Sequence, residues 1–283
     1  MISVNYFEPW KNYQNLNIRQ LAFALASPNL IHYFPSEIMA ASNINFHDSA
    51  EWQKFYYAYE PKLSQLDQNP EELNQFLGKI KSTRLGLRFE ALLWFWLQDP
   101  KNQYFQLLGH SIQSHHKGKT LGEIDFLIKN LETNKIEHWE VCLKYYLAEP
   151  DLALNTWIGL NPDDTLAQKL HHLAHRQFQF ETALGYLIDE KKVVIKGQFY
   201  LPQQHTHLPN WINTDRRLGE WYATLPNHAD LRRLKRSEWI CPEGTCTPQS
   251  SPIKWWNNGL YYNAKDECFT MLRLPQISYI LRK

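Results

Sequence analysis

Acidic side chains and one lysine alternate with apolar residues in two neighbouring segments. The first reads LGEIDFLIKN and carries Glu123 and Asp125; the second reads IEHWEVCLKYYL and carries Glu140 and Lys144. Because side chains alternate along an extended strand, Glu123 shares a face with Asp125, and Glu140 shares a face with Lys144. Carboxylate oxygens are ligands that Mg²⁺ prefers. The two segments therefore raise the question of what these charged side chains face in the folded protein.

The spacer between the two segments, NLETNK at 130–135, is polar and favours a turn. The segments are therefore expected to form an antiparallel hairpin. In one register Asp125 lies opposite Glu140, and the two carboxylates can hold one cation. In the register shifted by two residues, Asp125 lies opposite Cys142 and Glu123 lies opposite Lys144, which gives an ion pair and no metal site. Opposed side chains are about 5 Å apart. We favour the first register.

A helix is predicted before the hairpin, at 84–98, because large apolar residues recur there at helical spacing. Glu90 lies in its middle. A carboxylate among large apolar side chains costs on the order of several kcal/mol unless a partner satisfies it. Glu90 therefore needs a partner, and it is a further site candidate.

Other elements follow from similar patterns. Strands are expected at 104–114 and 193–201, and a second helix at 163–184 carries Lys169 on one flank of its apolar stripe. Residues 222–236 are expected to be helical, and residues 260–281 are expected to contain strands. The middle of the chain therefore runs helix, three strands, helix, strand, which is an α/β (α+β) pattern.

The whole sequence suggests a core with an extension on each side. We predict a helical extension at 1–83, an α/β core at 84–202 and a Trp-rich extension at 203–283. The net charge of +1 gives no general argument for nucleic-acid binding, although residues 232–236 form a local basic cluster. No stretch of 18 apolar residues and no signal peptide occur, so we expect a cytoplasmic location and no membrane partner.

The element order and the acids together resemble the PD-(D/E)XK nuclease superfamily. The residues that carry this resemblance are Glu90 in the first helix, the run Gly122-Glu123-Ile124-Asp125, and the run Glu140-Val141-Cys142-Leu143-Lys144. The resemblance covers about 84–202. A wider match, which continues through Tyr145-Tyr146-Leu147 and Trp157-Ile158-Gly159, resembles a bacterial family, the domain of unknown function 1853.

The nuclease resemblance implies a Mg²⁺- or Mn²⁺-dependent enzyme that hydrolyses phosphodiester bonds in DNA or RNA. It assigns the metal to Asp125 and Glu140, gives Glu90 a supporting or third-ligand role, and makes Lys144 the cation that positions water. Three further candidates are Glu123, Cys142 and Lys169, because the second helix of such folds often contributes a polar residue to the site.

The sequence departs from the superfamily pattern at one position. The pattern places the second acid two residues before the lysine, where this chain has Cys142; Glu140 lies four residues before Lys144. Two residues span about 7 Å of strand and four span about 13 Å. Two alternatives follow: an inactive nuclease fold that binds nucleic acid or a protein partner, and a different enzyme that uses the same carboxylates.

Overall fold

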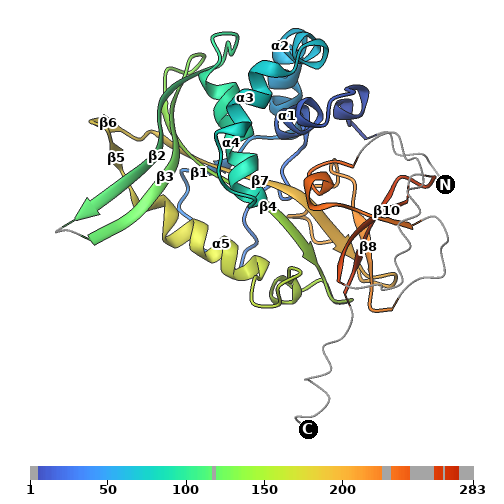
Figure 1. The fold of residues 1–283 in the computed structure, drawn as a ribbon. Coiled ribbons are helices and arrows are strands. Elements are labelled where there is room, and N and C mark those ends of the chain that lie inside the picture. Colours follow the sequence, from blue (N-terminus) through green and yellow to red (C-terminus); the bar gives the residue numbers. More distant parts are fainter. Residues whose placement is uncertain (1–5, 117–118, 225–230, 243–257, 264, 274–283) are drawn as a thin grey trace. The chain divides into compact units, whose positions relative to one another are not determined.

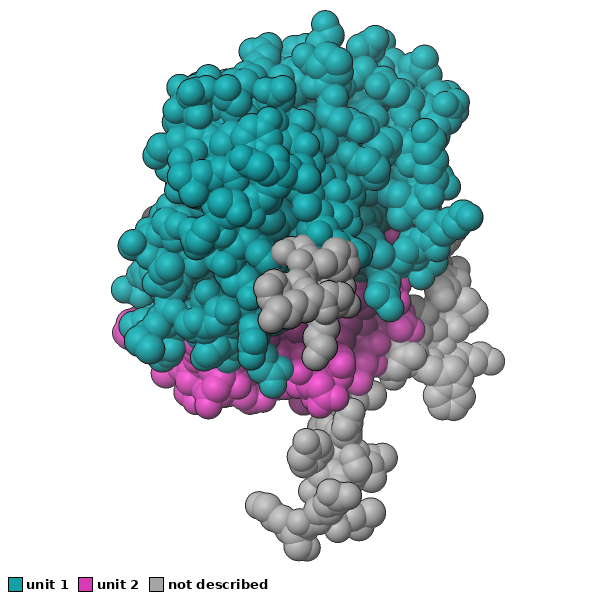
Figure 2. Space-filling view, turned by 90° about the vertical axis from the view of Figure 1, so that its left-hand side faces the viewer, with its two compact units in different colours: residues 1–144, 167–197, 210–216 teal, residues 145–166, 198–209, 217–283 magenta. Residues whose placement is uncertain are grey.

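The computed structural model describes residues 6–116, 119–224, 231–242, 258–263 and 265–273. These residues form two compact units, which Figure 2 colours separately. Unit 1 consists of residues 1–144, 167–197 and 210–216, and unit 2 consists of residues 145–166, 198–209 and 217–283. The predicted division at 84 and 202 follows neither boundary of these units and stays a prediction.

Five α-helices occur in the described residues. They are α1 (Leu16–Ala26), α2 (Ser49–Gln68), α3 (Glu71–Gly78), α4 (Leu85–Gln98) and α5 (Leu166–His175). The amino end of α2 is fixed by a capping box, in which Asp48 and Glu51 each accept a hydrogen bond from the other's backbone N–H. Helix α4 confirms the helix predicted at 84–98. None of these helices is long and apolar enough to cross a membrane.

Unit 1 contains a mixed sheet with the strand order β2-β3-β4-β7-β1. The strands are β1 (Ile44–Phe46), β2 (Phe105–His116), β3 (Lys119–Asn130), β4 (Ile136–Leu147) and β7 (Glu190–Leu201). β2 and β3 pair antiparallel, as do β3 and β4, whereas β1 joins β7 in parallel. The last three residues of β4 and the last four of β7 belong to unit 2.

The core of unit 1 is an aromatic cluster between this sheet and the helices. Trp139 of β4 lies 4.9 Å from Phe105 of β2 and 6.1 Å from Trp52 of α2, measured between ring centroids. Trp96 of α4 and Phe55 of α2 complete the cluster. Helices α1 to α4 lie on one side of the strands and α5 lies on the other (Figure 1). Within unit 1, β4 therefore lies between two helical layers.

From α4 to β7 the element order is helix, three long strands, helix, two short strands, long strand. The short strands β5 (Thr182–Ala183) and β6 (Tyr186–Leu187) were not predicted, and α5 ends at His175 instead of continuing to 184. The apolar stripe of α5 ends at Leu173. The chain then makes a 3₁₀ turn at Gln177–Gln179 and a tight hairpin. The mixed α/β class is thus as predicted.

Unit 2 contains the strands β8 (Gly219–Tyr222), β9 (Leu231–Arg233), β10 (Gly259–Asn263) and β11 (Cys268–Leu272). The strand order is β7-β8-β11-β10-β9. The predicted helix at 222–236 is wrong where the structure describes it, because residues 231–233 pair with β10 instead. Strand pairing here outweighs local helix propensity. β10 and β11 confirm the expected strands; residues 274–283 lie outside the described part.

One glycine fixes how β7 passes β4. Gly197 has a φ of +129°, and a Cβ there would overlap the backbone carbonyl of Lys144. Only glycine combines this backbone conformation with so close an approach between two strands. Gly197 therefore sets the position of the β4 segment that carries Lys144.

Candidate functional site

The strand register places the two predicted metal ligands opposite each other. The ladder between β3 and β4 runs from Lys129 with Ile136 to Phe126 with Trp139. The next positions are Asp125 and Glu140. The first of the two registers considered for the hairpin is therefore confirmed, and the alternative that pairs Asp125 with Cys142 is wrong. Beyond Phe126 the regular ladder stops.

Asp125 lies where the two strands separate. Its Oδ2 accepts a hydrogen bond of 2.8 Å from the backbone N–H of Val141. The side chain thus takes the role that a backbone carbonyl of β3 has in a regular ladder. The side chain is half-buried and points across to β4. Its carboxylate is thereby held at the point where β3 leaves β4.

Glu140 is fully buried, with 0% of its side chain exposed. Its Oε1 lies 2.7 Å from Nε2 of His138, and its Oε2 accepts a hydrogen bond from the amide of Gln177. A backbone hydrogen bond from Asp125 also reaches this carboxylate. Because a carboxylate has about four acceptor positions, Glu140 is strongly held and retains little freedom to rotate.

Burial and mutual repulsion disfavour two charged carboxylates here. Burial raises the pKa of Asp125 to about 8, and the charge of Glu140 adds to the rise. Burial also raises the pKa of Glu140 to about 8, with smaller contributions from Glu90 and Glu123 and an opposing one from Lys169. A proton or a cation is needed for both to be stable in the folded protein.

His138 is a neutral neighbour of this pair. Burial and, to a smaller extent, the charge of Lys191 lower its pKa to about 3. A neutral ring carries one N–H, and with that proton on Nε2 it donates to Glu140. Its Nδ1 is buried and has no hydrogen-bond partner among the described residues. His138 is thus a neutral donor and adds no charge to the site.

Two lysines approach the acids from different elements. Nζ of Lys169, on α5, donates to Oε1 of Gln177 at 2.9 Å, and Gln177 in turn donates to Glu140. Lys144 lies on β4 itself, where its backbone packs against Gly197. Burial raises the pKa of the Cys142 thiol, and of the two lysine charges that oppose the rise, Lys169 contributes more than Lys144.

Glu90 has the partner that its place in α4 requires. Its Oε1 lies 2.7 Å from Nε2 of His110, and both side chains are slightly exposed. The His110 ring stacks on Trp94 at 4.2 Å with an interplanar angle of 17°. The charge of Glu90 still reaches Asp125 and Glu140, since it contributes to the raised pKa of each. Glu90 therefore lies near the pair but hydrogen-bonds to a histidine.

The remaining predicted residues lie around this centre. Glu123 is exposed and accepts a hydrogen bond from the hydroxyl of Ser111. Within the described residues, no group of three or more His, Cys, Asp or Glu side chains is arranged to hold a metal ion. Asp125 and Glu140 are the two predicted ligands that the fold places opposite each other.

One known family model matches most of the chain. Residues 19–272 match the family model described as Domain of unknown function (DUF1853). The chain belongs to the DUF1853 family. No curated protein and no solved structure matches it. The match extends over residues of both compact units of this DUF1853 protein.

Three residues around the acids were not predicted from the sequence: His138, Gln177 and His110. His138 could have been predicted, because it lies two residues before Glu140 on one strand and so shares its face. His110 occupies a β2 position whose contact with α4 depends on tertiary packing. Gln177 approaches Glu140 only because α5 ends at His175 and a 3₁₀ turn follows, which the apolar pattern did not indicate.

Two residues of the basic cluster at 232–236 make contacts within unit 2 of the DUF1853 protein. Arg232 forms an ion pair of 2.7 Å with buried Glu238, and the guanidinium of Arg236 lies 5.9 Å from the ring of Trp239. Arg232 therefore has an internal structural role. Lys235 and Arg236 remain exposed.

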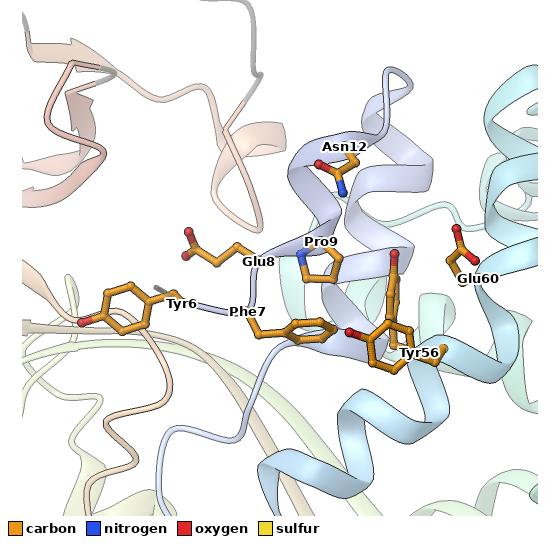
Figure 3. A pocket seen from close by; sticks show the side chains of 8 residues that line it. Tyr6, Phe7, Glu8, Pro9, Asn12, Tyr56 and Glu60 are labelled. Carbon is orange, nitrogen blue, oxygen red and sulfur yellow. The ribbon is translucent and has the colours of Figure 1, made fainter. Parts of the chain in front are cut away.

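A pocket of about 530 Å³ lies in unit 1 beside the N-terminal segment and α2 (Figure 3). Aromatic side chains dominate one part of it: the ring of Phe7 lies 5.7 Å from that of Tyr56 and 5.5 Å from that of Tyr57. Rings this close pack on one another and leave no room for a ligand between them. None of the residues that line the pocket belongs to the Asp125 and Glu140 cluster.

Proposed function

We propose that this DUF1853 protein is a metal-dependent hydrolase that cleaves phosphodiester bonds in DNA or RNA. The observation that carries the proposal is the placement of Asp125 opposite Glu140, in a buried setting that raises the pKa of both carboxyls to about 8. Two opposed acids are unfavourable unless a cation or a proton lies between them. A divalent cation satisfies this requirement and explains why both are carboxylic acids.

The donor set suits Mg²⁺ or Mn²⁺. Both ions prefer oxygen ligands, and protein sites for Mg²⁺ commonly use one or two carboxylates together with water and substrate phosphate. Asp125 and Glu140 supply these two carboxylates, and Glu90 supports them electrostatically. When bound, such an ion stabilises negative charge on a phosphate and makes a water molecule more acidic.

The chain's own residues have separate roles in this proposal. The N–H of Val141 orients Asp125, while His138 and Gln177 hold Glu140. A lysine beside the acids orients the attacking water, and the resemblance to the nuclease superfamily assigns this role to Lys144. A pre-positioned donor set of this kind lowers the cost of reorganisation during the reaction.

Cys142 supports a second candidate function, which is nucleic-acid or protein binding without catalysis. It occupies the position where the superfamily pattern places an acid, and its side chain is buried. Burial raises the pKa of the Cys142 thiol, so it stays protonated and is a poor ligand for a hard cation. In this alternative Asp125 and Glu140 are kept neutral by protons, and no metal ion lies between them.

The proposed activity is tested with fluorescent single- and double-stranded DNA and RNA oligonucleotides in the presence of Mg²⁺ or Mn²⁺. We expect cleavage by the wild type and a loss of at least about 100-fold in Asp125→Asn and in Glu140→Gln. The matched control is Glu132→Gln in the turn of the same hairpin, where Glu132 pairs with Lys54 and is exposed. Cleavage that persists in both site variants contradicts the assignment. Oligonucleotide binding without cleavage favours the second function.

A further inference from the structure

We infer that the cation which acts with Asp125 and Glu140 is Lys169 of helix α5, and that Gln177 positions it. This inference rests on the proposed function and changes one of its assignments. The water-positioning cation then comes from a helix that follows the hairpin, and Lys144 on β4 is not required for it.

The hydrogen bonds between these side chains have a single consistent direction. An ammonium group only donates, so Oε1 of Gln177 must be the atom that faces Lys169, at 2.9 Å. The amide nitrogen of Gln177 then faces Glu140 and donates to its Oε2. A flipped amide would place two donors against each other at Lys169 and two acceptors against each other at Glu140. The ammonium of Lys169 thus fixes the orientation of the Gln177 amide.

The packing of α5 keeps Lys169 in place. Leu166, Leu170 and Leu173 are fully buried along one stripe of this helix. Lys169 lies beside that stripe and is half-buried. Gln177 follows the end of the helix in a 3₁₀ turn, next to Phe178, whose ring contacts His138 at 4.9 Å. Lys169 and Gln177 therefore each lie next to buried apolar side chains, Lys169 beside the leucines of α5 and Gln177 beside Phe178.

The two lysines differ in how they reach Glu140. Only one side chain, that of Gln177, lies between the ammonium of Lys169 and the carboxylate of Glu140. Lys144 shares a strand face with Glu140 but lies about 13 Å along the strand from it. Lys169 is therefore the better placed of the two cations.

The test measures Mn²⁺ affinity by calorimetry at about pH 9, where proton competition is small. A unit positive charge close to the site repels Mn²⁺, so Lys169→Met should bind Mn²⁺ about 5-fold more tightly than the wild type. Structural damage would weaken binding, so the direction of the change separates the two causes. Lys169→Arg keeps the charge and should bind Mn²⁺ with the wild-type affinity. Lys144→Met should change the Mn²⁺ affinity less than about 2-fold.

The role of Gln177 is tested in the same titration. In a Gln177→Met background the ammonium is no longer held beside Glu140, so adding Lys169→Met should change the Mn²⁺ affinity less than about 2-fold. Tighter Mn²⁺ binding in Lys144→Met, or an unchanged Mn²⁺ affinity in Lys169→Met, overturns this inference but leaves the proposed function untouched. Asp125→Asn is the reference for the metal site itself. No Mn²⁺ binding by the wild type, or binding that Asp125→Asn leaves unchanged, overturns the proposed function and this inference with it.

Discussion

At the scale of single residues, the site is a pair of acids whose charged forms are both disfavoured. Burial raises the pKa of Asp125 from 3.8 to about 8 together with the charge of Glu140, and burial raises the pKa of Glu140 from 4.5 to about 8 together with the charges of Glu90 and Glu123. The folded protein therefore binds more protons than the unfolded chain between about pH 4 and pH 8. These two groups reduce stability as the pH rises through that window, which is the opposite of what a salt-bridged carboxylate does.

A pH-dependent effect of metal on stability follows from these shifted groups. The thermal unfolding temperature should rise on addition of Mn²⁺ by several degrees more at about pH 9 than at about pH 7, because protons no longer compete with the ion. His138 does not disturb the comparison, since its pKa is lowered to about 3 and it is neutral at both values. Asp125→Asn should remove the difference. A Mn²⁺ effect of equal size at both pH values contradicts the shifted carboxyls as the binding groups.

Removing one acid should relieve the repulsion in the metal-free protein. We expect Asp125→Asn to unfold at a higher temperature than the wild type at about pH 9 without metal, by a few degrees. The amide keeps the shape of the side chain, and its oxygen still accepts from Val141 N–H. The measurement is thermal unfolding with a chelator present. A lower unfolding temperature would mean that the charged carboxylate stabilises the fold.

At the scale of elements, the hairpin was predictable and the surroundings of Glu140 were only partly so. Alternation placed Asp125 and Glu140 on strands, and the polar spacer placed the turn, but two registers stayed open because local sequence does not encode cross-strand pairing. His138 follows from the same alternation. Gln177 does not, because its position depends on where α5 stops and on a 3₁₀ turn stabilised by packing. The helix predicted at 222–236 failed since pairing with β10 outweighs local propensity.

The close approach of β7 to β4 at Gly197 can be tested by substitution. Gly197→Ala should destabilise the fold by about 3–5 kcal/mol, because its Cβ would overlap the Lys144 carbonyl at a φ of +129°. The matched control is Gly86→Ala in α4, where a Cβ meets nothing within 4 Å. Alanine there should stabilise the helix by up to about 1 kcal/mol. Chemical denaturation measures both variants, and equal effects would contradict the close approach of the strands.

At the scale of the whole molecule, the predicted boundary at 202 falls within unit 2. The DUF1853 match covers residues 19–272 and so includes most of unit 2. Within unit 2, Leu147 at the end of β4 and Tyr200 near the end of β7 are buried in one cluster with Leu234, Leu260, Tyr262, Phe269 and Met271. Two strands of the predicted core therefore end inside the hydrophobic centre of unit 2.

A fragment tests the predicted boundary at 202. Residues 1–202 lack the strands that cover Leu147 and Tyr200, so we expect the fragment to expose this apolar surface and to aggregate or unfold without cooperativity. Thermal unfolding and limited proteolysis, compared with the full chain, measure this. A cooperative transition in the fragment would show that 203–283 is a separable extension, as first predicted from the sequence.

The most direct test of the central claim is the anomalous scattering of Mn²⁺ in crystals of the full chain soaked with the ion, beside matched crystals of Asp125→Asn. We predict one strong peak in the wild type between the carboxylates of Asp125 and Glu140, with the side chain of Gln177 still on Glu140, and no peak at this position in the variant. A wild-type crystal with no peak at these two carboxylates, at Mn²⁺ concentrations that saturate ordinary protein sites, would contradict the metal site and indicate that protons keep the two acids neutral.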